Sequence, residues 1–556
     1  MEKPREDRAA SDRQDRGYPD LRDHLRALDE AGLLCTIDAP INKDTELQPL
    51  VRWQFRGGIP EAERKAFLFT NVTDSKGRHY DIPVAVGALA ATPAIYSVGM
   101  GVPVAQIGDH WKKALASPVA PVVVTDAPCQ EVIVEGAALT GEGNGLDALP
   151  VPISTPGFDA APYFTATSCI TRDPDTLVQN MGTYRGGLKA PDRIGLKMFV
   201  NMRQGGHTHW HKYRARAEKM PIAMVVGVPP SLAYVSSQKI REGVDEISVA
   251  GALAGAPIRV TKAHSVDLLV PAEAEIVVEG LVDTEMFEPE APFGESHGHI
   301  NLEEYNFILE VTAITRRKDA ILTSIISQVT PSESSVIKRV AMEPRFLNHL
   351  RDALGIKGLR HVSMHEPLTN IRRIVFLVFE RGVATTEIWR AMYAASALDS
   401  AIGKYVIAVN EDIDPENGDA IFWALAYRAN PALDVVVLPH RDRGHGPALE
   451  RGGGEDASLL IDATLKSDMP PLALPKREYM EHAREMWERF GLPPLQPESP
   501  WFGYSLGDWT DEWDEMAKRA VEGRYLENGR RSAQLRRNDV APNTSIRDVP
   551  RVTDRN

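Results

Sequence analysis

Cysteine is scarce in this chain, whose 556 residues include only Cys35, Cys129 and Cys169. The three lie far apart, and no CxxC pair occurs. The sequence therefore predicts neither a disulfide framework nor a zinc site built from cysteines. This cysteine usage is typical of proteins from a reducing cytoplasm.

Long apolar runs are also missing. No uninterrupted apolar stretch reaches the ~20 residues that span a bilayer, and the N-terminal MEKPREDRAASDRQDRG lacks the apolar core of a signal peptide. We therefore expect a cytoplasmic protein with no membrane association. The net charge is −14, from 63 Lys and Arg against 77 Asp and Glu, and it argues against general nucleic-acid binding because it repels a phosphate backbone.

Several common catalytic and nucleotide-binding motifs are absent. The Gly186-Gly187 and Gly205-Gly206 pairs fit neither GxGxxG nor a P-loop, and neither GxSxG nor a cysteine-nucleophile signature occurs. The sequence therefore offers no standard ATP or dinucleotide site and no serine or cysteine hydrolase site.

The composition, 43% apolar and 25% charged, is that of a soluble globular protein. Short β-rich runs separated by Pro and Gly indicate a barrel-like or sandwich-like centre, and strands alternate with helices before and after it. We predict six segments: a disordered N-terminus (1–17), an α/β region (18–120), a β domain (121–330), a linker helix (331–355), a second α/β domain (356–480) and an extended tail (481–556) that packs on another surface.

The sharpest local feature is the phrase EAPFGE, from Glu290 to Glu295, in which Pro292 and Gly294 fix a turn that carries two carboxylates. If the pair is buried, one carboxyl is pushed towards neutrality and can donate a proton, provided that a cation holds the other. Arg185, at the end of QNMGTYR, is the candidate cation. The alternative is that these are ordinary surface charges.

Three histidines form a second constellation, GGHTHWH. If this segment is extended, its alternation places His207, His209 and His211 on one face, where they could bind zinc. The alternative is an edge strand or helix start whose histidines form hydrogen bonds. A histidine-zinc metallohydrolase centred on these residues is therefore a rival hypothesis.

A third phrase, YVSSQ, offers the vicinal hydroxyls of Ser236 and Ser237, and the acidic EGVDE, which includes Glu246, follows it. These hydroxyls could donate to a phosphate. Ordinary turn chemistry is the alternative, since Ser and Asp favour turns.

Together, NMGTYR, VSSQ, GVDEI, EAPFGES and NEDIDPENGDAIFWALAYRANP resemble the UbiD family of prenylated-FMN-dependent (de)carboxylases, in an extended C-terminal branch. The resemblance covers roughly Asp20 to Arg477. It implies a mixed α+β and α/β fold in which residues 121–330 form a split β-barrel that binds prenylated FMN and residues 356–480 line the substrate pocket.

The resemblance also implies roles for individual residues. Arg185, Glu290 and Glu295 match the catalytic network. Asn180, Glu246 and one histidine match ligands of Mn²⁺ (or Mg²⁺), with His207 the first choice and His209 the alternative, and K⁺ binds near the serines. The implied cofactor contacts are Asn180, Thr183, Tyr184, Arg185, His207, Ser236, Ser237 and Glu246.

The implied activity is reversible non-oxidative decarboxylation of an aromatic or other α,β-unsaturated acid. In the family it proceeds through a covalent cofactor–substrate adduct, loss of CO₂ and protonation, for which Glu295 is the expected donor. The implied partners are an aromatic acid, CO₂ and a flavin prenyltransferase that supplies the cofactor. Together with the aromatic-rich tail, the resemblance favours a homodimer or homohexamer.

Overall fold

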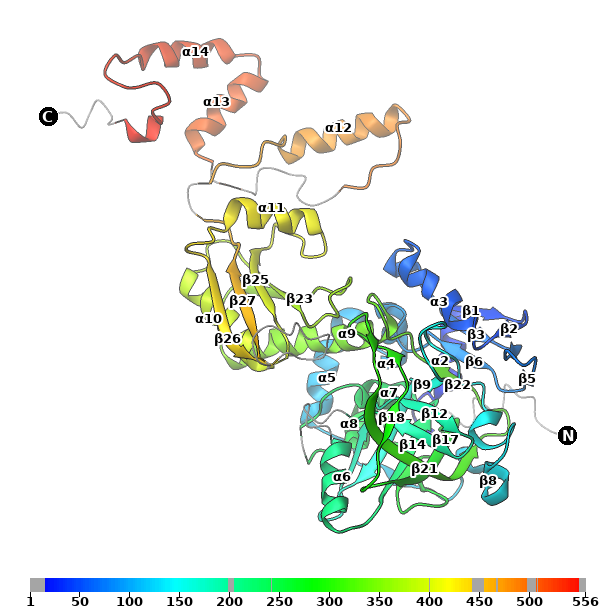
Figure 1. Ribbon diagram of the computed structural model, residues 1–556. Coiled ribbons are helices and arrows are strands. Elements are labelled where there is room, and N and C mark those ends of the chain that lie inside the picture. Colours follow the sequence, from blue (N-terminus) through cyan, green and yellow to red (C-terminus); the bar gives the residue numbers. More distant parts are fainter. Residues whose placement is uncertain are drawn as a thin grey trace. The chain divides into compact units, whose positions relative to one another are not determined.

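A computed structural model describes most of the chain, in two compact units: Met1–Ala408 with Asp434–Asp462, and Val409–Leu433 with Ala463–Asn556 (Figure 1). Nearly all of the N-terminus predicted to be disordered, and most of the aromatic phrase at 500–513, lie outside the described residues. The described residues are 16–198, 205–241, 243–399, 401–442, 455–466, 469–497, 507 and 509–549.

The N-terminal region opens with a capped amphipathic helix. Asp20 and Asp23 form a capping box at its start, and its apolar residues Leu21, Leu25 and Leu28 are buried. A four-stranded sheet, ordered β1-β3-β6-β22, follows it. The elements here are α2 (Leu21–Glu30), β1 (Leu34–Ile37), β2 (Ile41–Asn42), α3 (Leu47–Arg56), β3 (Ala66–Phe69), β4 (Val72–Thr73), β5 (His79–Tyr80), β6 (Val84–Val86), α4 (Pro93–Met100), α5 (Ile107–Ala116) and β22 (Leu322–Ser324).

The central domain is built on a ten-stranded sheet, whose main path is β11-β10-β14-β17-β21-β13-β12-β9. Its longest strand, β21, curves along the sheet in Figure 1 and also pairs with β8 and β18. The end strands β9 and β11 do not pair with each other in the part of the chain that the structure describes, so the sheet stays open. Its strands are β8 (Val132–Glu135), β9 (Tyr163–Phe164), β10 (Thr167–Arg172), β11 (Gln179–Gly182), β12 (Gly186–Ala190), β13 (Arg193–Leu196), β14 (Met220–Val226), β17 (Ile276–Val282), β18 (Glu288–Glu290) and β21 (Glu304–Arg316).

Three helices pack beside β10 and β11 or against one another, and they carry His207, Ser236 and Glu246 of the predicted cofactor contacts. They are α6 (Gly205–Ala215), α7 (Pro230–Ser236) and α8 (Glu246–Ala254). The small sheets of this domain are formed by β7 (Val122–Val123), β15 (Arg259–Lys262), β16 (Leu269–Pro271), β19 (Phe293–Gly294) and β20 (Ile300–Asn301).

The segment after residue 332 forms a helix and then a five-stranded sheet, ordered β23-β24-β25-β27-β26, with a hydrophobic core of its own. The mixed helix-and-sheet fold class predicted from the sequence is therefore confirmed. The elements are α9 (Glu333–Asn348), β23 (Leu359–Met364), β24 (Ile374–Phe379), α10 (Thr385–Leu398), β25 (Tyr405–Asn410), β26 (Val435–Arg441) and β27 (Asp456–Asp462).

The second unit is helical. It contains α11 (Gly418–Arg428), α12 (Arg477–Arg489), α13 (Asp511–Val521) and α14 (Tyr525–Gln534). None of the residues of α12, α13 and α14 is buried. None of the helices in the described ranges has both the length and the apolar composition needed to cross a bilayer.

Candidate active site

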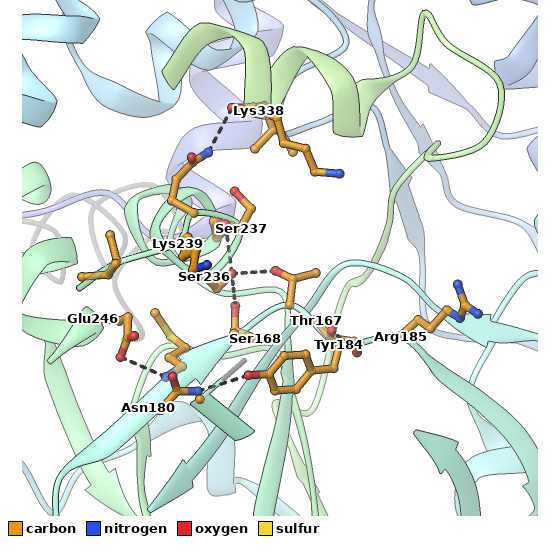
Figure 2. A pocket seen from close by; sticks show the side chains of 18 of the residues that line it. Thr167, Ser168, Asn180, Tyr184, Arg185, Ser236, Ser237, Lys239, Glu246 and Lys338 are labelled. Atoms are coloured by element: carbon orange, nitrogen blue, oxygen red, sulfur yellow. Dashed lines mark hydrogen bonds between the residues drawn. The ribbon is translucent and has the colours of Figure 1, made fainter. Parts of the chain in front are cut away.

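A cavity of ≈ 1350 Å³ brings together most of the residues singled out from the sequence (Figure 2). Strands β10 and β11, helices α6 to α9 and the turn after β19 all contribute to its wall. The predicted site residues on this wall are Asn180, Thr183, Tyr184, Arg185, His209, Ser236, Ser237, Glu246 and Glu295. The two that do not line it are Glu290 and His207.

Arg185 joins the two carboxylates of the EAPFGE phrase. Its Nε and Nη2 donate to Glu290 Oε1 and Oε2 at 2.7 and 2.9 Å, and its Nη1 donates to Glu295 Oε1. Glu290 is 2% exposed and Glu295 5% exposed. Burial alone would lower the pKa of Arg185, but its hydrogen bond to Glu290 and the charge of Glu295 raise that pKa above its usual value.

The surroundings of this cluster hold Arg185 in place. Its guanidinium lies 4.7 Å from the centre of the Phe293 ring, and that ring lies 4.0 Å from the ring of Tyr163. Asn306 Nδ2 donates to Glu290 Oε2 at 3.0 Å. Glu290 is therefore fully engaged behind Arg185, whereas Glu295 faces the cavity.

The turn that presents Glu295 is fixed by its backbone. Gly294 N donates to Asp159 Oδ1 at 2.9 Å, and Glu295 N donates to the His299 carbonyl at 2.9 Å. A Cβ at Gly294 would lie 2.6 Å from Thr155 Oγ1, so only glycine fits there. The predicted turn is thus present, and Asp159 is a supporting residue that sequence reasoning missed because it lies more than a hundred residues earlier.

Asn180 on β11 and Glu246 at the start of α8 meet at another part of the cavity. Glu246 Oε2 accepts from Met181 N at 3.1 Å, and burial raises the pKa of this carboxyl to about 7. A Cβ at Gly205 would lie 1.9 Å from Asn180 Oδ1, so glycine is needed where α6 begins. Amide and carboxylate oxygens are hard donors that suit Mn²⁺ or Mg²⁺.

The histidine segment is helical, so the extended conformation that would place the three histidines on one face does not occur, and the alternative of a helix holds. On α6, His207 and His211 lie one turn apart with ring centres 4.4 Å from each other, and His209 points elsewhere. His207 packs with Trp210 and Phe307 in an aromatic cluster. No group of three or more His, Cys, Asp or Glu side chains suited to a metal occurs among the residues described, which removes support from the zinc hydrolase.

His209 is the histidine on the cavity wall, and its Nδ1 lies 2.9 Å from Thr171 Oγ1. The structure therefore places the alternative histidine, and not the first choice, on the cavity that Asn180 and Glu246 line. Such a hydrogen bond at Nδ1 fixes the orientation of a histidine ring.

The paired serines end helix α7. Ser236 Oγ lies 3.1 Å from Ser168 Oγ and 3.0 Å from Thr183 Oγ1, and Ser237 Oγ donates to the Tyr234 carbonyl at 2.8 Å. Hydroxyls from three elements therefore converge on one part of the cavity wall (Figure 2).

Lys338 also lines the cavity, although no motif marked it. Burial lowers the pKa of its ammonium group to about 7. In the sequence, Lys338 is marked only by its position in SSVIKRVAM, where it interrupts the apolar face of the predicted helix.

Two protein-family domains and several solved structures are similar to this chain. The 3-octaprenyl-4-hydroxybenzoate carboxy-lyase Rift-related domain matches residues 122–329, and the corresponding C-terminal domain matches residues 336–463. An evolved dimeric form of the UbiD-class enzyme HmfF from Pelotomaculum thermopropionicum, solved with prFMN, is 27% identical, with a TM-score of 0.70 over 82% of this chain and 97% of that one.

Two further structures share the fold. The 3,4-dihydroxybenzoic acid decarboxylase AroY of Klebsiella pneumoniae is 24% identical, with a TM-score of 0.70 over 83% of this chain and 99% of that one. The vanillic acid decarboxylase of Sedimentibacter hydroxybenzoicus is 22% identical, with a TM-score of 0.67 over 91% and 99%. Because the two family domains together match more than half of its residues, this chain belongs to the UbiD family of carboxy-lyases.

Proposed function

We propose that this protein reversibly decarboxylates an aromatic or other α,β-unsaturated carboxylic acid with prenylated FMN. The observation that carries the proposal is the buried Arg185–Glu290–Glu295 cluster on the wall of a large cavity. The structural similarity to HmfF, which was solved with prFMN, supports the choice of cofactor.

The cavity residues suit this cofactor. Asn180, His209 and Glu246 would hold Mn²⁺ or Mg²⁺ beside the flavin phosphate, and the hydroxyls of Thr183 and Ser236 would lie along the cofactor, with K⁺ near the serines. When bound, prenylated FMN supplies the electron sink that loss of CO₂ from an sp² carbon requires and that no side chain can supply.

The two glutamates would have different tasks, because only one of them reaches the cavity. Glu295 lines the cavity, so it is the proton donor to the carbon that loses CO₂. Glu290 does not line it and instead holds Arg185 through two hydrogen bonds. Arg185 then orients the substrate carboxylate and keeps Glu295 in position.

Reconstitution tests this proposal. Protein coexpressed with a flavin prenyltransferase should bind about one prenylated flavin per chain and release CO₂ from aromatic acids, and protein without the cofactor should release none. The proposal would be refuted if protein without flavin released CO₂. It would also be refuted if CO₂ release depended on the zinc content and not on the flavin content.

The remaining partners follow from the same proposal. The prenyltransferase supplies the cofactor, and the aromatic acid and CO₂ are substrate and product. We also propose a homodimer or homohexamer, because Trp487 on α12 and Trp509, which lies just before α13, are exposed aromatic side chains that a subunit contact would cover.

A further inference from the structure

Two basic side chains line the same cavity. Lys338 projects from α9, and Arg372 lies in the loop between β23 and β24. Within the described ranges, neither the Lys338 ammonium nor the Arg372 guanidinium makes a hydrogen bond or an ion pair. Figure 2 shows the Lys338 side chain reaching into the cavity.

The charges that act on these cations place them at the catalytic part of the cavity. Arg372 and Glu295 are the charged groups that act on Lys338, and Asp399, which also lines the cavity, and Arg373 are those that act on Arg372. Glu295 is already engaged with Arg185, so it does not neutralise Lys338.

The backbone before Arg372 is strained. Asn370 and Ile371 have φ values of 54° and 48°, a region that a β-branched residue such as Ile371 rarely adopts. Thr330 holds the loop, since its Oγ1 accepts from Asn370 N at 3.2 Å and its carbonyl accepts from Leu368 N at 3.0 Å. Strain that the surroundings maintain is typical of residues whose side chains are aimed for a function.

The face of α9 that lines the cavity suits an aromatic ring. Ser334, Lys338 and Met342 recur at intervals of four residues, so they lie on the same side of the helix, and all three line the cavity. Met342 gives a polarizable apolar surface one turn from the ammonium group.

We propose that the natural substrate is an aromatic dicarboxylic acid, and that Lys338 and Arg372 bind the carboxylate that is retained. This inference rests on the proposed function: one carboxylate is lost beside Arg185 and Glu295, and the other stays with the cation pair. Desolvated cations that form no ion pair are unfavourable, so an anionic substituent would both bind and neutralise them. A guanidinium also matches a carboxylate through two parallel hydrogen bonds.

Matched substrates test the inference. Benzene-1,3- and 1,4-dicarboxylate are compared with their monomethyl esters, which keep the ring and one carboxylate but lose the second charge. For the loaded enzyme we expect kcat/KM for a diacid to exceed that for its ester by about tenfold or more. Lys338→Met and Arg372→Met should each remove about tenfold of this preference for diacid over ester, mainly through KM. Lys113→Met, at an exposed lysine of α5 outside the cavity, is the control.

A binding measurement separates this inference from the proposed function. Calorimetric titration of the diacids into protein loaded with unmodified FMN reports affinity without turnover. Tighter binding of diacid than of ester, lost in both variants, supports the inference even if no acid loses CO₂. Equal affinity for diacid and ester overturns it, and so does a fall in flavin content of Lys338→Met, which would assign the lysine to the cofactor.

Discussion

At the scale of single residues, the site depends on one guanidinium that holds two carboxylates. Arg185 binds Glu290 through two parallel hydrogen bonds and still has Nη1 for Glu295. This arrangement requires the planar, fixed fork of arginine, since an ammonium group presents its donors without that geometry. The sequence suggested the partnership, because Arg185 is the cation in the NMGTYR phrase, but burial and distances decide that the charges are not surface ones.

Arg185→Lys should therefore lower kcat by about 10²-fold, because a small displacement of catalytic groups costs that much. Flavin content should remain near the wild-type value, and steady-state CO₂ release measures the loss. Arg193→Lys, at a neighbouring half-exposed arginine of β13, is the matched control and should keep its rate. An Arg185→Lys enzyme with the wild-type rate would show that the fork is not needed.

The lowered pKa of Lys338 predicts a pH dependence of diacid binding. With its pKa at about 7, and with Arg372 and Glu295 as the charges that face it, Lys338 is charged below pH 7 and neutral above it. Diacid affinity of the FMN-loaded protein should be constant below pH 7 and fall by up to about tenfold per pH unit above it. Titrations from pH 6 to 9 check this, and Lys338→Met and the monoesters should show no such fall. A flat wild-type profile contradicts the prediction.

At the scale of elements, helix α6 shows where a pattern misleads. Spacing of two residues puts three histidines on one face only in a strand. In the helix, residues 207 and 211 share a side and residue 209 faces another. GGHTHWH has no apolar repeat of helical period, so its helical phase depends on Trp210 packing against Phe287 and Phe307, which lie far along the chain.

The orientation of His207 and His209 on α6 predicts that their substitution has different effects. His209→Ala should lose most of its bound Mn²⁺, whereas His207→Ala should keep the metal and lower the melting temperature, because it removes a packed ring from the aromatic cluster. Elemental analysis and thermal unfolding of the two variants check this. If His207→Ala loses the metal and His209→Ala keeps it, the assignment is wrong.

Most elements could be predicted from the sequence, and the exceptions have physical reasons. Apolar runs predicted β10, β14, β17 and β21, which are buried in the central sheet. Strand β23, LRHVSM, could not be predicted from the sequence because its residues do not alternate between buried and exposed positions. Strand β27 was also not predicted, because it follows a long connection. Ser236 and Ser237 were expected after a strand but end helix α7, since Pro230 starts a helix there.

At the scale of the whole molecule, the cavity is assembled from residues between 21 and 442, and all of them belong to the first unit. Motif reading found the parts that lie within short phrases, such as NMGTYR and EAPFGE. It could not find Lys338, Arg372 or Asp159, because each contributes alone and only the fold brings it to the cavity. None of the described residues after Asp442 lines the cavity, so the tail does not contribute to its wall.

Removal of residues 477–556 should therefore leave flavin binding unchanged, because none of these residues lines the cavity. If a subunit contact covers the exposed Trp487 and Trp509, the truncated protein should also have a lower mass in solution. Flavin absorbance per chain and light scattering measure the two effects. Loss of flavin from a folded truncated protein would contradict this division of the chain.

The most direct test of the central claim is exchange of solvent deuterium into the carbon that loses CO₂. Glu295→Gln keeps the shape of the proposed donor but removes its proton, so exchange and decarboxylation should both slow by about 10²–10⁴-fold while flavin content stays the same. Glu295→Gln enzyme that incorporates deuterium at the wild-type rate would contradict the account.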